Sequence, residues 1–320
     1  MLTLFQALTL CLIGALPAQA AEPDWPNAIT IATGSRGGTY HAYGEGLARL
    51  LTRTLGIRVA ALETDGPSEN IQLIEDGAAQ ISFVTMGVAQ QAWNGAGDWQ
   101  GAAPRRDARA VFPMYDTPFH FVVPSGSSIM SIVDLAGKRI GVGPEGGSSE
   151  TYSPALLKSL GVEVTPVSGT WEDLTGQLRL GGVDALAVAA GVPFPAVSEL
   201  EAAKAISYVP LSPAQILTAR LAIPELNAST IPAGTYPSLM YGYDTVGLYN
   251  FAVVDKDLPG SLVYEIVRAV FENHEEMMAI HPAAASTLPQ NFVQNTFLPY
   301  HDGAIRYYGN AGAPGVLIAD

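Results

Sequence analysis

The stretch Gly34-Ser-Arg-Gly-Gly-Thr-Tyr40 decides how this sequence folds, because it separates two patterns that belong to different kinds of structure. Before it, Ile29–Ala32 is a short apolar run of strand length, and after it leucines recur at helical spacing from Leu47 to Leu55. A glycine-rich turn between a strand and a helix lets the backbone approach a ligand closely and presents the free N–H groups of the helix start. The stretch therefore predicts a strand-turn-helix unit whose turn can cradle an anion.

The same alternation of strand-length runs and helical patterns continues along the chain, with Gly, Ser or Pro at each switch. Val59–Leu62 leads into the loop Gly66–Asn70, and Ile81–Val84 leads into a further helix. The order then restarts where Arg139–Val142 leads into the loop Gly143–Glu150. Alternation of this kind is typical of α/β proteins. The restart of one design predicts two lobes.

Further elements follow in the second half of the sequence. The patterns predict a helix over Trp171–Leu180 and strands over Val183–Ala189 and Ile206–Val209. Near the end, Gly247–Val254 is extended and apolar, and a helix is expected from Leu258 to about Ala279. An α/β fold with strands and helices in both lobes is therefore expected.

Two extended apolar segments, residues 111–123 and 243–254, flank the predicted second lobe, and we expect them to be the crossings between lobes. The first lobe would consist of residues 21–115 plus 250–320, and the second of residues 116–249. Each lobe is expected to be a mixed sheet flanked by helices. Because ligands of open α/β sheets bind at the carboxyl ends of the strands, the ligand cleft should lie between the lobes.

The first twenty residues contain an apolar core followed by Ala18-Gln19-Ala20, the small-residue pattern of a secretory signal. We expect cleavage after Ala20 and a periplasmic location, although no Lys or Arg precedes the apolar core. The run is shorter than the ~20 apolar residues that a membrane span needs, which disfavours a membrane anchor. The single cysteine, Cys11, lies in this segment, so we expect no cysteine chemistry in the mature chain.

Charge and motif content exclude several classes of function. The chain has 16 Lys and Arg against 30 Asp and Glu, and no basic cluster longer than Arg105-Arg106, so we expect no nucleic-acid partner. The five histidines lack the spacing of metal ligands, and neither a G-x-S-x-G elbow nor a G-x-G-x-x-G fingerprint occurs. We therefore expect no metal, no cofactor and no enzymatic activity.

Three loops bring hydroxyl or amide side chains to a glycine-rich helix start: Gly34–Tyr40, Gly66–Asn70 and Gly143–Glu150. Ser and Thr at such positions also serve as ordinary helix caps, and for any one loop that alternative stays open. Three loops in matching places on two lobes favour a ligand cleft. The residues that we expect to bind the ligand are Arg36, Gly37, Gly38, Thr39, Tyr40, Ser68, Asn70, Ser148, Ser149 and Tyr243.

Charged and aromatic residues near these loops suggest more specific roles. Arg36 is the only cation in the loops and either pairs with a carboxylate of the ligand or is a solvated surface residue. Tyr243 lies on the predicted return crossing, where it would either line the pocket or be half-buried in the packing. Three glutamates near the cleft would either contact an ammonium group of the ligand or complement the helix dipoles: Glu69, Glu145 and Glu150.

Taken together, the motifs resemble those of TAXI-type solute-binding proteins, the periplasmic receptors of one class of TRAP transporters. The resemblance runs through nearly the whole mature chain. It is carried by Thr33–Tyr40, Thr64–Asn70, Asp134–Gly143, Ala190–Pro193, Ile231–Pro237 and Leu298–Tyr308. The second-lobe loop departs from the family, because relatives often read Gly-Ser-Gly-Thr-Glu where this chain has Gly146-Gly-Ser-Ser-Glu150.

The resemblance implies a two-lobed receptor of the type II periplasmic-binding-protein fold that closes on a small organic anion. It implies glutamate, 2-oxoglutarate or a related dicarboxylate or amino acid as the ligand, and a sodium-driven TRAP membrane permease as the partner. A monomer is expected, because the lobes must hinge. The alternatives are a periplasmic sensor that passes its ligand to a signalling partner, and an unrecognised exported enzyme.

Overall fold

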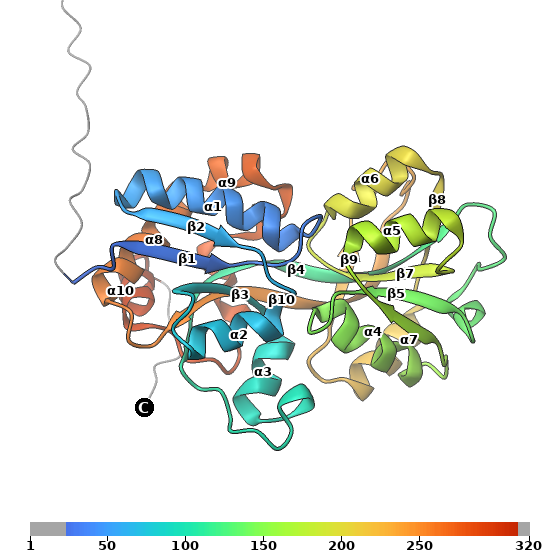
Figure 1. Cartoon of the computed structure of the whole chain (residues 1–320), viewed down its shortest axis with the longest axis horizontal. Helices are drawn as coiled ribbons and strands as arrows, with labels where there is room; N and C mark the ends of the chain where they lie inside the picture. The colour runs from blue at the N-terminus through green and yellow to red at the C-terminus, as the bar shows by residue number, and fades with distance from the viewer. Residues whose placement is uncertain (1–23, 313–320) are drawn as a thin grey trace, which may run out of the picture.

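The computed structural model describes residues 24–312, so the predicted signal peptide, its cleavage site after Ala20 and Cys11 lie outside the described residues. Figure 1 shows two lobes side by side, each with helices packed around a sheet, joined by strands that run from one lobe into the other. Within the described residues, no helix combines the length and the apolar character that crossing a bilayer requires.

The elements alternate along the chain as the sequence predicted. The strands are β1 (Ala28–Ala32), β2 (Arg58–Leu62), β3 (Ile81–Thr85), β4 (Ala108–Pro124), β5 (Arg139–Gly143), β6 (Thr165–Ser168), β7 (Ala185–Ala189), β8 (Ile206–Val209), β9 (Asn227–Ile231) and β10 (Tyr243–Asp255). The helices are α1 (Thr39–Leu55), α2 (Pro67–Glu75), α3 (Met86–Asn94), α4 (Ser148–Ser159), α5 (Trp171–Leu180), α6 (Pro195–Ala203), α7 (Pro213–Ala222), α8 (Gly260–Glu272), α9 (His274–Ile280) and α10 (Asp302–Asn310).

Two long antiparallel strands, β4 and β10, run through both lobes. β4 has 17 residues, which corresponds to a length of ~56 Å at the usual rise per residue. It pairs with β10 from Pro118 opposite Gly247 to Ala108 opposite Asp255. Most residues of both strands are buried, as expected for strands that are covered on both faces. The predicted crossings, residues 111–123 and 243–254, lie within these two strands.

The sheet of the two lobes follows one continuous strand order, β2-β1-β3-β10-β4-β7-β5-β6. β1, β2 and β3 are parallel to one another, as are β5, β6 and β7, and the crossing strands are antiparallel to both groups. The mixed-sheet α/β fold that the sequence predicted is therefore present. The lobe boundaries at 115/116 and 249/250 stay a prediction, because β4 and β10 pass through them without interruption.

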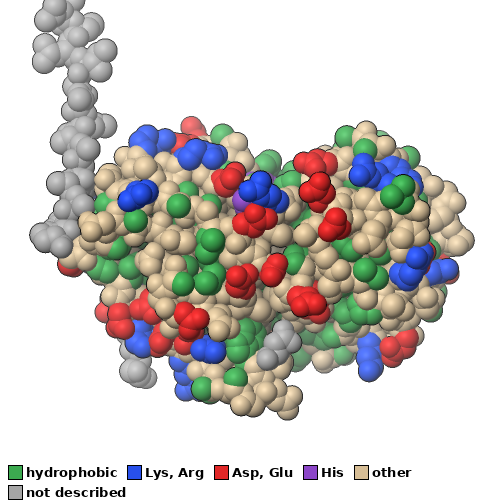
Figure 2. Space-filling view, viewed as in Figure 1, with side chains coloured by type: hydrophobic (Ala, Val, Ile, Leu, Met, Phe, Trp, Pro, Cys, Tyr) green, Lys and Arg blue, Asp and Glu red, His purple; other side chains and the backbone are tan. Residues whose placement is uncertain are grey.

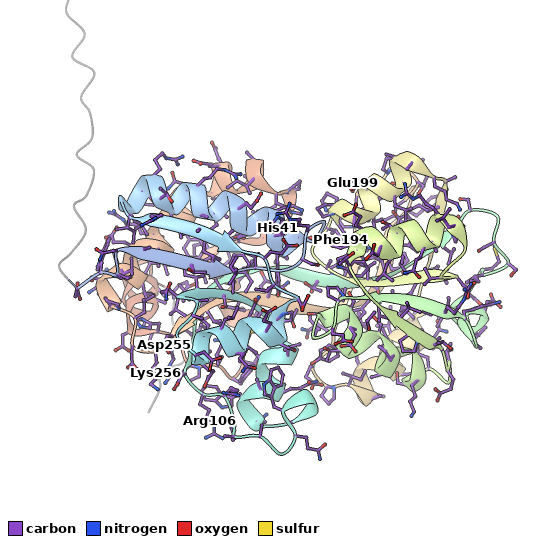
Figure 3. All side chains as sticks on the ribbon, viewed as in Figure 1. His41, Arg106, Phe194, Glu199, Asp255 and Lys256 are labelled. Carbon is purple, nitrogen blue, oxygen red and sulfur yellow. The ribbon has the colours of Figure 1, made fainter. Side chains whose placement is uncertain are left out.

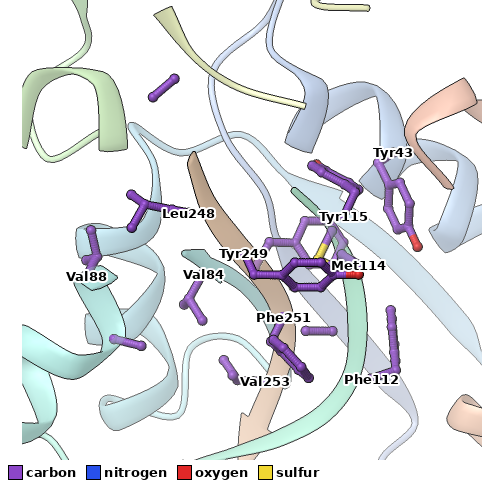
Figure 4. Packing of buried hydrophobic residues seen from close by; sticks show 14 of the residues in the cluster. Tyr43, Val84, Val88, Phe112, Met114, Tyr115, Leu248, Tyr249, Phe251 and Val253 are labelled. Atoms are coloured by element: carbon purple, nitrogen blue, oxygen red, sulfur yellow. The ribbon is translucent and has the colours of Figure 1, made fainter. Parts of the chain in front are cut away.

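Large side chains of the crossing strands form the core of the first lobe. Figure 4 shows Phe112 of β4 and Phe251 of β10 in one cluster with Val84 of β3 and Tyr43 of α1. All four side chains are completely buried. Because apolar burial is the main favourable term in folding, these contacts fix β4 and β10 against the helices of this lobe.

The structure departs from the sequence prediction in the C-terminal helices. The single helix expected from Leu258 to about Ala279 is two helices, α8 and α9, separated at Asn273. The backbone N–H and the side-chain Nδ2 of Asn273 both donate to the carbonyl oxygen of Ala269, at 3.2 and 2.8 Å. An asparagine side chain that bonds its own helix in this way competes with helix continuation.

Three elements were not predicted at all, α7, β9 and α10, and the first two have weak patterns in the sequence. α7 begins with a capping box formed by Ser212 and Gln215, but only Ala219 among its residues is buried. A helix with so little buried surface has no clear apolar stripe in the sequence. β9 is mostly exposed and joins the sheet only through the edge of β10. Neither α7 nor β9 therefore has a periodic apolar pattern from which the sequence could predict it.

Helices α8 and α10 approach each other closely at Gly303, where a Cβ atom would lie 2.4 Å from the carbonyl oxygen of Gly260. Backbone atoms cannot rotate away, so we expect Gly303→Ala to lower the free energy of unfolding by ~1–3 kcal/mol. Gly309→Ala is the control in the same helix, because nothing lies within 4 Å of its Cβ position. Chemical denaturation should show no loss for Gly309→Ala, and equal losses would contradict the close packing.

Candidate ligand site between the lobes

A cavity lies where the strand-to-helix turns of the two lobes meet. Its volume is about 70 Å³, which is several times the ~10–15 Å³ that one water molecule needs. The first lobe contributes residues from loops 34–40 and 65–67, and the second from segments 142–149 and 189–194. Thr85, Trp171 and, from the crossing strands, Thr117 and Asn250 complete the lining.

The two lobes present the same turn to this cavity. Residues 35–38 and residues 144–147 each form a four-residue turn, closed by a backbone hydrogen bond from the fourth residue to the first, at 3.0 and 3.2 Å. The third residue has a positive φ in both turns, +76° at Gly37 and +72° at Gly146. Type II turns require this conformation at that position, and glycine adopts it without strain.

Each of these turns leads into a helix that has no side-chain cap. The cap residues Gly38 of α1 and Gly147 of α4 both line the cavity and offer no side-chain hydrogen bond to the helix. In the second lobe, α5 is capped by the side chain of Thr170 and α7 by that of Ser212, whereas α6 also begins without a side-chain cap. The first N–H groups of a helix have no partner inside it and carry a partial positive charge. Two such helix starts, one from each lobe, therefore lie at the cavity wall.

Direct hydrogen bonds join the lobes around the cavity. They are Ser68 N to Gly146 O (3.3 Å), Ala196 N to Gly37 O (3.1 Å), Thr39 Oγ1 to Gly191 O (2.6 Å) and the contact between Thr85 Oγ1 and Ser148 Oγ (3.1 Å). The first two use N–H groups from the starts of α2 and α6. Those two helix starts, which also border the cavity, thus hold the lobes together, whereas among the described residues the starts of α1 and α4 donate no backbone hydrogen bond to the opposite lobe.

The crossing strands supply a polar floor. The side chain of Asn250 is fully buried, and its Nδ2 donates to Tyr115 O and to Thr117 Oγ1, both at 2.6 Å. Its Oδ1 accepts a hydrogen bond from the hydroxyl of Tyr40 at 2.6 Å. The Tyr40 proton is therefore used inside the protein, while Thr117, which accepts from Asn250, keeps its own proton free to donate.

An aromatic wall stands on the second-lobe side, where Phe194 meets Trp171 edge to face at 5.1 Å between ring centroids. Figure 3 shows Phe194 on this side of the cleft and His41 of α1 on the other. The Phe194 N–H donates to the hydroxyl of Tyr236 at 2.8 Å, which in turn lies 3.3 Å from Nε2 of buried His120. Burial lowers the pKa of His120 to about 4, so its ring is neutral.

Five of the ten residues nominated from the sequence line the cavity: Gly38, Thr39, Tyr40, Ser148 and Ser149. Arg36 does not, because its guanidinium forms an ion pair with Glu63 at 2.9 Å and its side chain is 79% exposed. The Arg36 guanidinium also holds the pKa of Glu63 below its usual range. Gly37 lines a separate surface groove beside Arg36, and its carbonyl oxygen accepts a hydrogen bond from the backbone N–H of Ala196 at the start of α6.

The remaining three nominated residues have contacts within the protein. Ser68 lies in an outer groove, and its backbone joins the two lobes. Asn70 is fully buried, and its Nδ2 donates to Thr33 O and Phe83 O, both at 2.7 Å. The hydroxyl of Tyr243 donates to a backbone carbonyl at 2.6 Å and accepts from a backbone N–H at 3.2 Å, away from the cavity. Whether any of the ten residues binds a ligand stays a prediction.

Several lining residues escaped the sequence argument: Asp65, Thr85, Thr117, Trp171, Phe194 and Asn250. Thr117 and Asn250 carried a signal, because each is a polar residue inside an otherwise apolar strand pattern. Phe194 follows directly after the motif Ala190–Pro193. Nothing local distinguishes Asp65, whose place in the lining depends on how the two lobes meet.

Comparisons with known proteins extend these observations. The model of the NMT1-like family matches residues 31–312. Solved structures similar to this chain include a periplasmic transporter (TM-score 0.53, 14% identity, covering 89% of this chain and 94% of that chain). Another is Tv2483 bound to L-arginine (TM-score 0.52, 13% identity, covering 82% of this chain and 90% of that chain). A third is an ancestral arginine-binding protein bound to arginine (TM-score 0.50, 16% identity, covering 82% of this chain and 96% of that chain).

At these identities the likeness concerns the fold alone. The α/β fold of the type II periplasmic binding proteins, which the sequence predicted, is confirmed.

The buried ring of His120 gives a pH dependence that can be measured. Its folded pKa of about 4 lies below the 6.5 of an unperturbed histidine, so the unfolded chain binds the proton more readily. The stability that neutral His120 supplies is complete above pH 6.5 and is lost as the pH falls toward 4. We expect the difference in unfolding free energy between wild type and His120→Asn to shrink by ~2–3 kcal/mol from pH 7 to 4.5.

Urea denaturation of both proteins at the two pH values measures this difference. Asp116, whose pKa burial raises to about 6, titrates in both proteins and therefore cancels in the comparison. A difference that stays constant with pH would contradict the burial of a neutral His120.

Proposed function

Because this chain belongs to the NMT1-like family, we propose that it is a periplasmic solute receptor that closes on a small organic anion and delivers it to a membrane transporter. The observation that carries the proposal is the cavity between two matching uncapped helix starts, α1 from one lobe and α4 from the other. The signal pattern that ends at Ala20 supports export, and cleavage there is part of the proposal.

Helix starts supply the positive side of this site without any basic side chain. Among the described residues that line the cavity, none is Lys, Arg or His. A helix start carries the equivalent of about half a positive charge, and hydrogen bonds to an anionic acceptor stabilise by ~1.5–3 kcal/mol each. Micromolar binding needs about 8 kcal/mol in total. Several N–H groups from α1 and α4, with Thr117 and one hydroxyl of the Thr85–Ser148 pair, are sufficient for this.

The dimensions of the cavity favour a small ligand. A volume of about 70 Å³ accommodates a compact molecule rather than a sugar chain or a peptide. Two anion-binding helix starts on opposite sides suit either one carboxylate shared between the lobes or a dicarboxylate that spans them. In both cases the ligand contacts both lobes and therefore favours the closed arrangement through its higher affinity for that form.

The resemblance to TAXI-type receptors supplies the transporter class. We propose a sodium-driven TRAP permease as the partner, and glutamate, 2-oxoglutarate or a related dicarboxylate or amino acid as the ligand. The receptor would work as a monomer whose lobes, residues 21–115 plus 250–320 and residues 116–249, move about the crossing strands β4 and β10. The motifs Thr33–Tyr40 and Thr64–Asn70, which support this assignment, border the cavity.

A thermal-shift screen of the purified protein tests the ligand class. The compounds are C4–C6 dicarboxylates, oxoacids, amino acids and neutral sugars, and a ligand present at 100 times its Kd stabilises the folded state by ~2.7 kcal/mol. Stabilisation by organic acids or amino acids, and not by sugars, is the expected result. A response to a neutral sugar alone would overturn the proposal.

The role of the α4 helix start can be tested at its cap residue. An aspartate in place of Gly147 would accept hydrogen bonds from the first turn of α4 and place a negative charge at the site. We expect Gly147→Asp to weaken binding of the identified ligand by about 100-fold. Gly147→Ala is the matched control, because it adds the same Cβ atom, 3.0 Å from Pro144 O, without a carboxylate.

Isothermal titration calorimetry of the two variants gives the comparison. A much larger loss for the aspartate would support the helix start as the anion site. Equal losses would attribute the effect to the added Cβ and remove the α4 start from the binding site.

A further inference from the structure

Asp65 is the single charged residue among the described residues that line the cavity, and it is exposed and also borders an outer groove. Asp65 directly precedes the cap residue of α2, and its carbonyl oxygen lies 3.5 Å from the Cβ position of Gly147. It therefore stands at the seam between the lobes, beside the start of α4. An anion held by the helix starts would meet a negative charge at short range, unless the same ligand also carried a positive charge.

The other carboxylates near the loops are used differently. Glu69 accepts a hydrogen bond from the backbone N–H of Asp65 at 2.7 Å, and Glu150 accepts one from that of Gly146 at 3.3 Å. Glu145 lies in the outer groove with Asp65 and Glu69 and does not line the cavity. Within residues 24–312, the structure shows no hydrogen bond or ion pair to the carboxylate of Asp65.

Two further observations favour a positive group on the ligand. The hydroxyl of Tyr40, which also lines the cavity, donates its proton to Asn250 Oδ1 and can only accept from a ligand. Figure 2 shows acidic side chains from both lobes along the seam. Asp65, Glu69 and Glu145 border one groove there, so the local potential at this edge of the cavity is negative.

We propose that Asp65 binds the ammonium group of a ligand whose carboxylate lies between the starts of α1 and α4, so that the receptor prefers amino acids to the corresponding oxoacids. This inference rests on the proposed function and narrows its ligand class. An oxoacid of the same carbon skeleton has a carbonyl oxygen in place of the ammonium group. Asp65 would then face an acceptor and remain unpaired, which penalises the oxoacid.

Matched pairs of compounds test the inference, because the members of each pair differ only at the carbon next to the carboxylate. The pairs are L-glutamate with 2-oxoglutarate, L-aspartate with oxaloacetate, and L-alanine with pyruvate. For the pair that fits the cavity, we expect the full protein to bind the amino acid at least about tenfold more tightly. Isothermal titration calorimetry measures both affinities.

Substitution at Asp65 then identifies the residue responsible. Asp65→Asn keeps the shape and removes the charge, and we expect it to weaken amino-acid binding by about tenfold or more while sparing the oxoacid. Glu145→Gln is the matched control, because it removes the same charge from the outer groove and should leave the preference unchanged. Asp65→Ala is a second variant in case the asparagine disturbs folding, which a thermal melt would show.

The outcomes separate this inference from the function on which it rests. Wild-type protein that binds an oxoacid as tightly as its amino acid would overturn the role of Asp65 and leave the receptor proposal standing. If Glu145→Gln lost the preference for the amino acid as well as Asp65→Asn, the preference would come from the combined negative charge of the groove. That result would also overturn a direct contact between Asp65 and the ligand. Failure to bind any of the six compounds or any other organic acid would overturn both proposals.

Discussion

The antiparallel pairing of β4 with β10 is the interaction on which both lobes depend. Each lobe adds its own parallel strands to one side of this pair. The two strands therefore connect the lobes and also lie between their parallel strands. The register of the pair shifts between Tyr249 and Phe251, and the side chain of Asn250 at this irregularity bonds Tyr115 O and Thr117 Oγ1 on β4. The floor of the cavity is therefore part of the crossing strands, about which the lobes of the proposed receptor would move.

Helix starts take two distinct roles around that floor. Those of α2 and α6 donate backbone hydrogen bonds to the opposite lobe, whereas those of α1 and α4 follow matching turns and, among the described residues, donate no such bond. N–H groups without a partner are costly when they are buried, so a protein keeps them uncapped where solvent or a ligand satisfies them. In the same lobe the starts of α5 and α7 carry side-chain caps, although Trp171 at the start of α5 also lines the cavity.

Charge is organised locally rather than across the whole surface. The chain carries a net charge of −14, yet exposed charges act weakly beyond a screening length of ~8 Å at physiological ionic strength. The helix starts are the positive elements at the cavity, and Asp65 is the one carboxylate in the described lining. Arg36, the only cation in the three glycine-rich loops, forms an ion pair with Glu63 and does not line the cavity. An acidic protein can thus hold an anion, because fixed dipoles at short range outweigh distant surface charges.

The sequence by itself determined the elements and the turns, because these depend on residues close together along the chain. The local pattern around Ile29–Ala32 and Gly37 predicted a strand, a glycine-rich turn and a helix, and the structure has these elements there and again around Gly146. Only the tertiary structure decided which polar side chains face the cavity. Asn70 is held in the core by the carbonyl oxygens of Thr33, just after β1, and of Phe83 in β3, and Asp65 enters the lining only where α2 meets the second lobe. Periodicity and turn chemistry carry no information about such partners, because these lie outside the local segment and only the packing of the strands and lobes brings them close.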